Sequence, residues 1–338
     1  MDPLETVPPD AAGLLRRGTL LGAGLGRDEI DRLLRTGRLL TVRRGVYRLA
    51  GAEAPSAEAM HVLRARGVAP DLADGAVFGH VTAALALGLP VWGVPLDRLH
   101  VIRDRRDGGR VRARTHVHGA PLPEPDVVDL GGLHVTSAAR TVADLARTLP
   151  AERALVTVDA ALHLWVRRDP SRPPDPGATT IDEVRQVLTR FAGRRGVLPA
   201  RRVLALADPR CESPGESRSR LRMRLAGLPA PVTQWAVPGQ GVRTDFAWPG
   251  LGVVGEFDGR VKYGRALRPG DDLADVLWRE KRREDRIRAT GLTVVRWIWS
   301  EIADDGPGGM AQRLRTRLTD PTHPVVSRRT GRDGCGDR

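Results

Sequence analysis

The sequence predicts an α+β protein of several domains, on three observations. The chain has 338 residues, more than the usual size of one domain. The proline-rich stretch RRDPSRPPDPGATT indicates a linker. Helical and strand-like hydrophobic patterns alternate on both sides of it. We expect an N-terminal helix–turn–helix unit with a two-stranded wing (11–50), a mixed α/β middle domain (56–165), the linker (166–180), a helical connector (181–210), a C-terminal αβββαβ domain (212–318) and a disordered tail (319–338).

The charge balance is strongly basic and favours a polyanionic partner. Lys and Arg number 54 against 41 Asp and Glu, which gives +13 and a pI near 11.1. All but two of the basic residues are Arg, the exceptions being Lys262 and Lys281. Such a bias, together with abundant Ala, Gly and Pro, is typical of a GC-rich coding sequence. Part of the arginine excess therefore reflects codon usage, and the charge has to be located before it indicates nucleic acid.

Membrane and secreted classes are not favoured. No stretch approaches the ~20 apolar residues that span a bilayer. The start MDPLETVPPD lacks the basic and apolar segments of a signal peptide, so we expect a cytoplasmic protein without membrane contact. The only cysteines, Cys211 and Cys335, can form neither a disulfide framework nor a four-cysteine zinc site.

The first unit has the pattern of a winged helix. A short helix near Thr19 and a second helix at 27–35 are separated by a glycine-containing turn. Two short strands, 39–42 and 46–49, follow and are joined by the basic hairpin Arg43-Arg44-Gly45. A winged helix places its second helix in a major groove and its wing against the phosphate backbone.

The charges of this unit agree with double-stranded DNA as its partner. Between positions 27 and 48, seven Arg face three acidic residues, a local charge of +4. The arginines we expect to contact DNA are Arg27, Arg32, Arg35, Arg43 and Arg44. The alternative is a winged helix that docks a protein and whose arginines are merely solvated.

Three phrases in the first 150 residues carry a resemblance to a known family. They are RLLRTGRLLTVRRGVYRLAG, FGHVTAALALGLP (78–90) and LHVTSAARTVADLAR (133–147). Over about residues 11–150 the chain resembles the AbiEi family of antitoxins from type IV toxin–antitoxin systems. The resemblance implies a winged helix that binds operator DNA and represses transcription. It also implies a following domain linked to neutralising a cognate toxin protein.

Five histidines of the middle region raise the question of a metal site. They are His80, His100, His116, His118 and His134. His116 and His118 have strand spacing and lie on one face, which supplies two ligands but not three. With no cysteine or carboxylate cluster nearby, we expect these histidines to be ordinary strand and loop residues.

The last domain carries carboxylates in strands. A helix beginning at Glu216 is followed by strand patterns that contain Asp245, then Glu256 and Asp258 on one face. A strand interior is a costly place for carboxylates unless they are paired or bind a cation. A turn at Pro249 can bring Asp245 and Glu256 together, joined by Glu216. We expect these two strand carboxylates to bind Mg²⁺, which could support phosphodiester hydrolysis.

Both lysines of the chain lie in this region. Lys262 follows Glu256 by six residues, and Lys281 belongs to a charged helix. Lysine can lose its proton when desolvated, which arginine cannot, so chemistry that needs a base would retain it. Alternatively, Lys281 pairs with Glu284 and Asp285 on a solvated helix face.

The same residues carry a second resemblance. The pattern RTDFAWP…VVGEFDGRVKY…REKRREDRIRATGLTVVRW resembles the domain-of-unknown-function group related to very-short-patch-repair endonucleases, in the PD-(D/E)xK nuclease superfamily, over about 212–302. It implies a restriction-endonuclease-like fold. The implied catalytic residues are Glu216, Asp245, Glu256 and Lys262, with Asp245 and Glu256 as metal ligands. Secondary candidates are Asp258, Lys281 and Asp285.

The sequence departs from this family at two positions. Asp258 stands where the superfamily has lysine, and Lys262 stands where the repair enzymes have histidine. Three hypotheses follow: a DNA-binding regulator that does not cut, a Mg²⁺-dependent DNA endonuclease in repair or defence, and a protein-interaction module. They differ in whether they require a metal.

Overall fold

The computed structural model describes residues 4, 7–51, 53–105, 108–259, 278, 282–283, 285–287 and 289–319. The chain divides into two compact units, Met1–Ala207 and Asp208–Arg338. Three separate sheets with helices around them confirm an α+β protein of more than one domain. Lys262, Lys281 and all but the first residue of the expected tail lie outside the described residues. Among the residues it does describe, no helix has the length and apolar character to cross a membrane.

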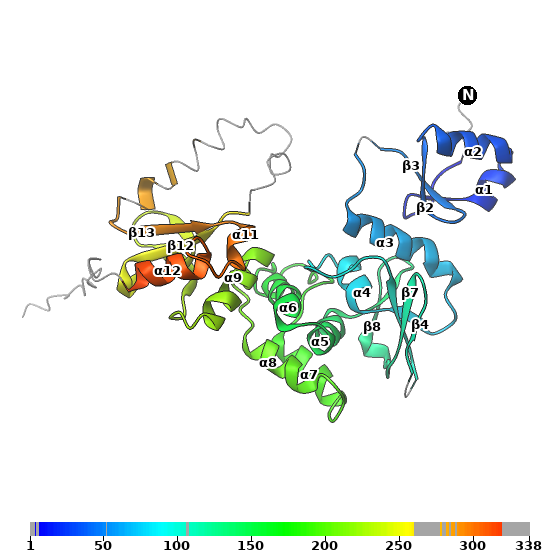
Figure 1. The fold of residues 1–338 in the computed structure, drawn as a ribbon. Helices are drawn as coiled ribbons and strands as arrows, with labels where there is room; N and C mark the ends of the chain where they lie inside the picture. Colours follow the sequence, from blue (N-terminus) through cyan, green and yellow to red (C-terminus); the bar gives the residue numbers. More distant parts are fainter. Residues whose placement is uncertain are drawn as a thin grey trace, which may run out of the picture. The chain divides into compact units, whose positions relative to one another are not determined.

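Unit 1 begins with two helices and a small antiparallel sheet (Figure 1). The elements are β1 (Leu14–Arg16), α1 (Arg17–Gly22), α2 (Arg27–Arg35), β2 (Leu39–Arg43) and β3 (Val46–Leu49). The helix–turn–helix and the hairpin lie where the hydrophobic periodicity predicts them. The sheet has three strands in the order β1-β3-β2 rather than two, because Leu14 to Arg16 pair with the outer side of β3.

Helix α3 (Ala57–Val68) joins this region to the rest of unit 1. Its Ser56 caps the first turn by accepting a hydrogen bond from the backbone N–H of Ala59 at 3.2 Å. Met60 and Leu63 of α3 pack against a buried cluster under the small sheet, formed by Leu14, Val42 and Val46. Helix α3 therefore covers the three-stranded sheet.

A six-stranded mixed sheet forms the centre of unit 1. Its order is β6-β7-β5-β4-β9-β8, with β5–β7 and β4–β9 parallel and the other pairs antiparallel. The strands are β4 (Ala76–Phe78), β5 (Leu99–Arg103), β6 (Arg110–Val111), β7 (Thr115–Gly119), β8 (Val127–Asp129) and β9 (His134–Thr136). Two single-turn helices, η1 (Ala69–Asp71) and η2 (Glu124–Asp126), lie between elements.

Helix α5 is the most enclosed helix of unit 1 and contacts α4, α6, α7 and α8. These helices are α4 (His80–Ala86), α5 (Ala138–Thr148), α6 (Ala151–Val166), α7 (Ile181–Arg190) and α8 (Val197–Ala205). The end of the expected linker (166–180) packs onto them at residues 177–180. The N–H of Thr179 donates to Ala161 O at 3.3 Å, and a Cβ on Gly177 would lie 2.6 Å from Leu87 O. The end of the stretch is therefore held against the helices, whereas residues 169–176, which include its prolines, are exposed.

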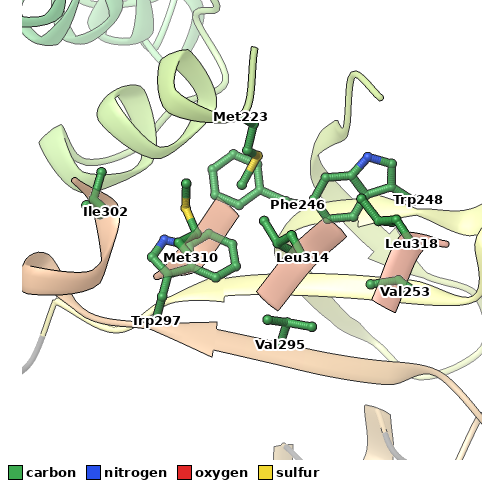
Figure 2. Packing of buried hydrophobic residues seen from close by; sticks show 10 residues of the cluster. All are labelled: Met223, Phe246, Trp248, Val253, Val295, Trp297, Ile302, Met310, Leu314 and Leu318. Atoms are coloured by element: carbon green, nitrogen blue, oxygen red, sulfur yellow. The ribbon is translucent and has the colours of Figure 1, made fainter. Parts of the chain in front are cut away.

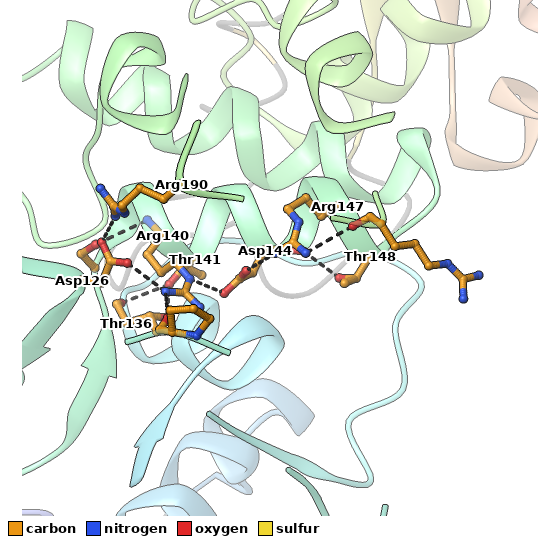
Figure 3. A network of polar contacts seen from close by, with 11 residues as sticks. Asp126, Thr136, Arg140, Thr141, Asp144, Arg147, Thr148 and Arg190 are labelled. Carbon is orange, nitrogen blue, oxygen red and sulfur yellow. Dashed lines mark hydrogen bonds and ion pairs between the residues drawn. The ribbon is translucent and has the colours of Figure 1, made fainter. Parts of the chain in front are cut away.

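Arg140 of α5 is fully buried and holds a charged network (Figure 3). Its Nε donates to Asp144 at 2.8 Å, and its Nη1 donates to Asp126 at 2.8 Å and to Pro121 O at 2.7 Å. Arg190 of α7 reaches the same Asp126. Because buried charges need paired hydrogen-bonding partners, this network ties α5 to η2 and α7.

Unit 2 follows the element order that the sequence predicts. Its elements are α9 (Pro214–Leu225), β10 (Val232–Val237), β11 (Val242–Trp248), η3 (Pro249–Leu251), β12 (Val253–Phe257), β13 (Thr293–Trp297), α11 (Trp299–Ile302) and α12 (Met310–Leu318). The sheet order is β10-β11-β12-β13, antiparallel except for β12–β13. Between β12 and β13, residues 282–283 and 285–287 are helical.

Apolar residues cover both faces of this sheet. On one face, Phe246 and Trp297 stack with ring centroids 5.6 Å apart, and Met223 of α9 and Met310 of α12 pack against them (Figure 2). On the other face lies a cluster of Val237, Ala247, Val254, Ile287 and Leu292. Since side chains alternate along a strand, Asp245 and Glu256 lie on the face of Ala247 and Val254, beside the helical segment of Ile287.

Candidate functional site

Asp245 and Glu256 are neighbours on adjacent strands. Phe246 of β11 pairs with Gly255 of the antiparallel strand β12. Asp245 precedes Phe246 and Glu256 follows Gly255, so the two carboxylates lie opposite each other. They border a pocket of about 170 Å³. The pocket is lined by Asp245, Glu256, Phe257, Asp258, Gly259, Arg283 and Arg296. The expected meeting of the two strand carboxylates is therefore confirmed.

Among the acids of unit 2 that the structure describes, Asp245 has the pKa that departs furthest from its usual value. Its Oδ2 accepts a hydrogen bond from the backbone N–H of Phe257 at 2.8 Å. Burial, together with the negative charges of Glu216 and Glu256, raises the pKa of Asp245 from 3.8 to about 7 against that hydrogen bond. Within the described residues, Asp245 forms no ion pair.

Glu256 is buried, and its charge is balanced by two arginines. Its Oε1 lies 2.6 Å from Arg283 Nη2, and its Oε2 lies 2.9 Å from Arg296 Nη2. Arg296 is also its partner in the parallel β12–β13 register. The pocket thus has a carboxylate side at Asp245 and a guanidinium side at Arg283 and Arg296.

Glu216 is held by hydrogen bonds at the start of α9. Its Oε1 accepts a hydrogen bond from Ser213 Oγ at 2.8 Å, and its Oε2 accepts from the N–H of Glu212 at 3.0 Å and from Gln234 Nε2 at 2.9 Å. Ser213 Oγ in turn accepts from the N–H of Glu216, which closes the start of α9. Glu216 is not among the residues that line the pocket, but its negative charge raises the pKa of Asp245 more than that of Glu256 does.

The remaining predicted residues of this site differ in position. Asp258 lines the pocket, as a third carboxylate. Asp285 is exposed on the helical segment and is not part of the pocket lining. The two lysines, Lys262 and Lys281, lie outside the described residues.

A glycine fixes the approach of Phe257 to helix α9. A Cβ on Gly215 would lie 2.0 Å from the Phe257 ring, so only glycine admits the ring there. Phe257 supplies the N–H that binds Asp245. Gly215 therefore positions one wall of the pocket, a role that the sequence alone does not reveal because the two residues are 42 positions apart.

The predicted DNA-binding arginines divide into two groups. Arg27, Arg32, Arg35 and Arg44 are exposed. Arg43 instead donates from Nη1 to Gly67 O at 2.9 Å and to Asp71 Oδ2 at 2.5 Å, so it is held against α3 and η1. Its expected place at the hairpin tip is not observed, which leaves Arg44 as the tip arginine.

Helix α2 carries no net positive charge. Its three arginines are matched by Asp28, Glu29 and Asp31. Two of the acids lie in the first turn and two of the arginines in the last, as the helix dipole favours. The positive excess of the winged region therefore lies outside α2, where the hairpin arginine Arg44 is exposed.

The histidines of unit 1 form a cluster that the sequence did not predict. His80, His100 and His118 bring one ring nitrogen each to within 4.8 Å of one another, and no other such group of three occurs in the part of the chain that is described. The strand spacing paired His118 with His116, which is not a member of this group. His80 completes the group from the start of α4, a tertiary contact without a local sequence signal.

Comparisons with known proteins give relatives without an assigned activity. No family model matches the chain. The uncharacterized protein Rv2248 of Mycobacterium tuberculosis strain H37Rv is 28% identical over 295 residues, which cover 86% of this chain and 97% of that protein. The uncharacterized protein MT2308 of strain CDC 1551 gives the same values. A crystal structure of the RV2827C protein from M. tuberculosis aligns with a TM-score of 0.38 and 17% identity, over 68% of this chain and 81% of that one.

Proposed function

We propose that the protein binds double-stranded DNA and that unit 2 carries a Mg²⁺-dependent phosphodiesterase site centred on Asp245. The observation that supports this is the pocket in which Asp245, Glu256 and Asp258 meet beside two arginines, where burial and two neighbouring carboxylates also raise the pKa of Asp245 to about 7. A buried acid under such repulsion is stabilised by a divalent cation. Perturbed acids in a pocket are also typical of functional sites.

The donor atoms of the pocket suit Mg²⁺. This ion is commonly held by one or two carboxylates while water and phosphate oxygens complete its shell. Asp245 and Glu256 would supply the carboxylates, with Asp258 beside them. When bound, the ion would lower the pKa of a water molecule and stabilise charge on phosphate oxygens.

The chain's own residues supply the rest of the site. Arg283 and Arg296 give one wall positive charge, which attracts a phosphodiester. The same two arginines bind both oxygens of Glu256 and fix its orientation. Asp245 is held by the Phe257 N–H, so its other oxygen has a defined direction. The resemblance to very-short-patch-repair endonucleases favours DNA as the phosphodiester.

The winged region would hold the DNA. Its hairpin presents Arg44, and Arg27, Arg32 and Arg35 are exposed on α2. Lysine and arginine contacts to phosphates release counterions and make binding dependent on salt. The resemblance to AbiEi antitoxins favours the same assignment.

Cleavage of supercoiled plasmid tests the proposal. We expect nicked and linear products with Mg²⁺ or Mn²⁺ and none with EDTA. Asp245→Asn, which keeps the side-chain shape, should slow cleavage at least ~100-fold. Asp285→Asn removes an exposed acid of the same unit and is the matched control. Cleavage that persists in Asp245→Asn would identify a contaminating nuclease and reject the site.

A DNA-binding regulator that does not cut is the second candidate. Two observations favour it: Glu256 is already bound by two arginines, and Asp258 stands where lysine is usual in the resembling superfamily. Like AbiEi antitoxins, such a regulator would repress its own operator and neutralise a cognate toxin. Specific, salt-sensitive binding to the DNA upstream of its gene, without cleavage in any metal, would support this candidate over the first.

A further inference from the structure

Two parallel strands of unit 1 place three imidazoles on one face of the sheet. In the β5–β7 register, His100 pairs with His116 and Ile102 pairs with His118. Because side chains alternate, these three histidines share a face. The rings of His116 and His118 stack with centroids 3.9 Å apart.

The fourth imidazole comes from the start of α4. His80 has a φ of 50°, a left-handed conformation that few non-glycine residues adopt, and its side chain is buried. The N–H of the preceding Gly79 donates to His100 O at 3.0 Å, and a Cβ on Gly79 would lie 2.6 Å from Ile102. This close approach brings the His80 ring onto His118, with centroids 3.9 Å apart.

The nitrogen atoms have spacings that a metal ion can bridge. His100 Nδ1 and His118 Nε2 are 3.0 Å apart, and a nitrogen of His80 lies within 4.8 Å of both. A tetrahedral Zn²⁺ with Zn–N bonds of about 2.0–2.1 Å holds its ligand nitrogens about 3.3–3.4 Å apart. The three nitrogens, at separations of 3.0 Å for one pair and up to 4.8 Å for the others, lie near this spacing.

The protonation state of the cluster suits metal binding. Burial lowers the pKa of His100 to about 4 and that of His118 to about 2, and it lowers the pKa of His80 as well. The rings are therefore neutral at pH 7, and neutral imidazole is the form that binds metals. The charge of Asp144 raises the pKa of His118, and the charge of Arg140 lowers that of His80. These two buried residues of α5 therefore act on the cluster electrostatically.

We propose that His80, His100 and His118 bind one transition-metal ion, with Zn²⁺ as the expected species and water in the fourth position. The ion would join α4 to strands β5 and β7. This inference is independent of the Mg²⁺ site proposed for unit 2, because its ligands are imidazoles of unit 1. Imidazole nitrogen suits Zn²⁺, Ni²⁺ and Cu²⁺, whereas Mg²⁺ prefers oxygen.

Metal titration of the full chain, purified without a histidine tag, tests this site. We expect one Zn²⁺ per chain by elemental analysis. Co²⁺ added to the metal-free protein should give the visible absorption of a tetrahedral nitrogen site. His118→Gln and His100→Gln should weaken Co²⁺ binding by at least ~10-fold, since even the loss of an outer partner costs about that much.

His134→Gln is the matched control, since His134 is exposed on β9 and does not belong to the cluster. It should leave Co²⁺ binding unchanged. Absence of the tetrahedral Co²⁺ spectrum in the unmodified chain would overturn the proposal, whatever the variants do. Equal Co²⁺ affinity in the unmodified chain and in folded His118→Gln would also overturn it.

Discussion

Asp245 of β11 is bound by the main-chain N–H of Phe257 on β12, at 2.8 Å. This bond places the carboxylate at the end of β12, between the negative charges of Glu216 and Glu256. The bond favours the ionised form, yet burial and repulsion outweigh it and keep the pKa near 7. A cation at this position would favour the ionised form of Asp245 and lower its pKa.

The first prediction concerns the pH dependence of stability without divalent cations. The pKa of Asp245 is raised on folding, so its carboxyl lowers the free energy of unfolding as pH rises from about 4 to about 7; this loss is complete above pH 7 and absent below about 4. The rise corresponds to at most about 4 kcal/mol. Asp245→Asn should therefore raise the stability of unit 2 at pH 8 in EDTA, and the gain should disappear at pH 4. Urea unfolding followed by tryptophan fluorescence measures this, because five of the seven tryptophans lie in unit 2.

Asp258→Asn is the control for this prediction. It removes an acid from the same pocket without touching the Phe257 hydrogen bond. If Asp245→Asn raises the free energy of unfolding equally at pH 4 and pH 8, the carboxylate of Asp245 is not destabilised by burial and by its charged neighbours.

The second prediction concerns Gly215. An alanine there would place its Cβ 2.0 Å from the Phe257 ring and force the ring to move. We expect Gly215→Ala to lower the free energy of unfolding of unit 2 by about 1–3 kcal/mol. Gly250→Ala is the matched control, since no atom lies within 4 Å of its added Cβ. Equal unfolding midpoints for the two variants would contradict this packing.

The third prediction concerns the buried network of unit 1. Arg140→Ala leaves Asp126 and Asp144 buried without their common partner, which typically costs about 3–5 kcal/mol. Arg190 binds the same Asp126 from a position that is 41% exposed, so Arg190→Ala should cost less than about 1 kcal/mol. Hydrogen exchange of the α5 amides compares the two. Similar exchange rates in the two variants would argue against a structural role for the buried ion pairs of Arg140.

The fourth prediction separates the two wing arginines. Arg44→Glu should weaken DNA binding. It should also reduce the slope of log affinity against log salt concentration by about 1, the value for one phosphate contact. Arg43→Ala should mainly lower stability, because Arg43 holds Asp71 and Gly67 O. Affinity measured at several salt concentrations decides the matter. A larger loss of affinity in a folded Arg43→Ala protein would assign the phosphate contact to Arg43.

The local parts of the fold were predictable from the sequence. Hydrophobic periodicity placed α2 at Arg27–Arg35 and β11 at Val242–Trp248, and alternation placed Asp245 and Glu256 together. The sequence did not predict β1, since three residues are too few to show a pattern. It also missed the capping role of Glu216, the ion pair of Arg43 with Asp71 and the arrival of His80 beside His118. Each of these depends on contacts between residues that are distant in the sequence. Gly79 and Gly215 are examples, because a Cβ at either position would collide with a side chain from another element.

Binding of Mn²⁺, observed by electron paramagnetic resonance as the loss of free-ion signal, tests the Asp245 site most directly. Mn²⁺ takes the oxygen ligands that Mg²⁺ takes. We predict one saturable site in the full chain that Asp245→Asn removes and that His118→Gln leaves intact. Retention of the site in folded Asp245→Asn, or no binding by the unmodified chain, would contradict the account.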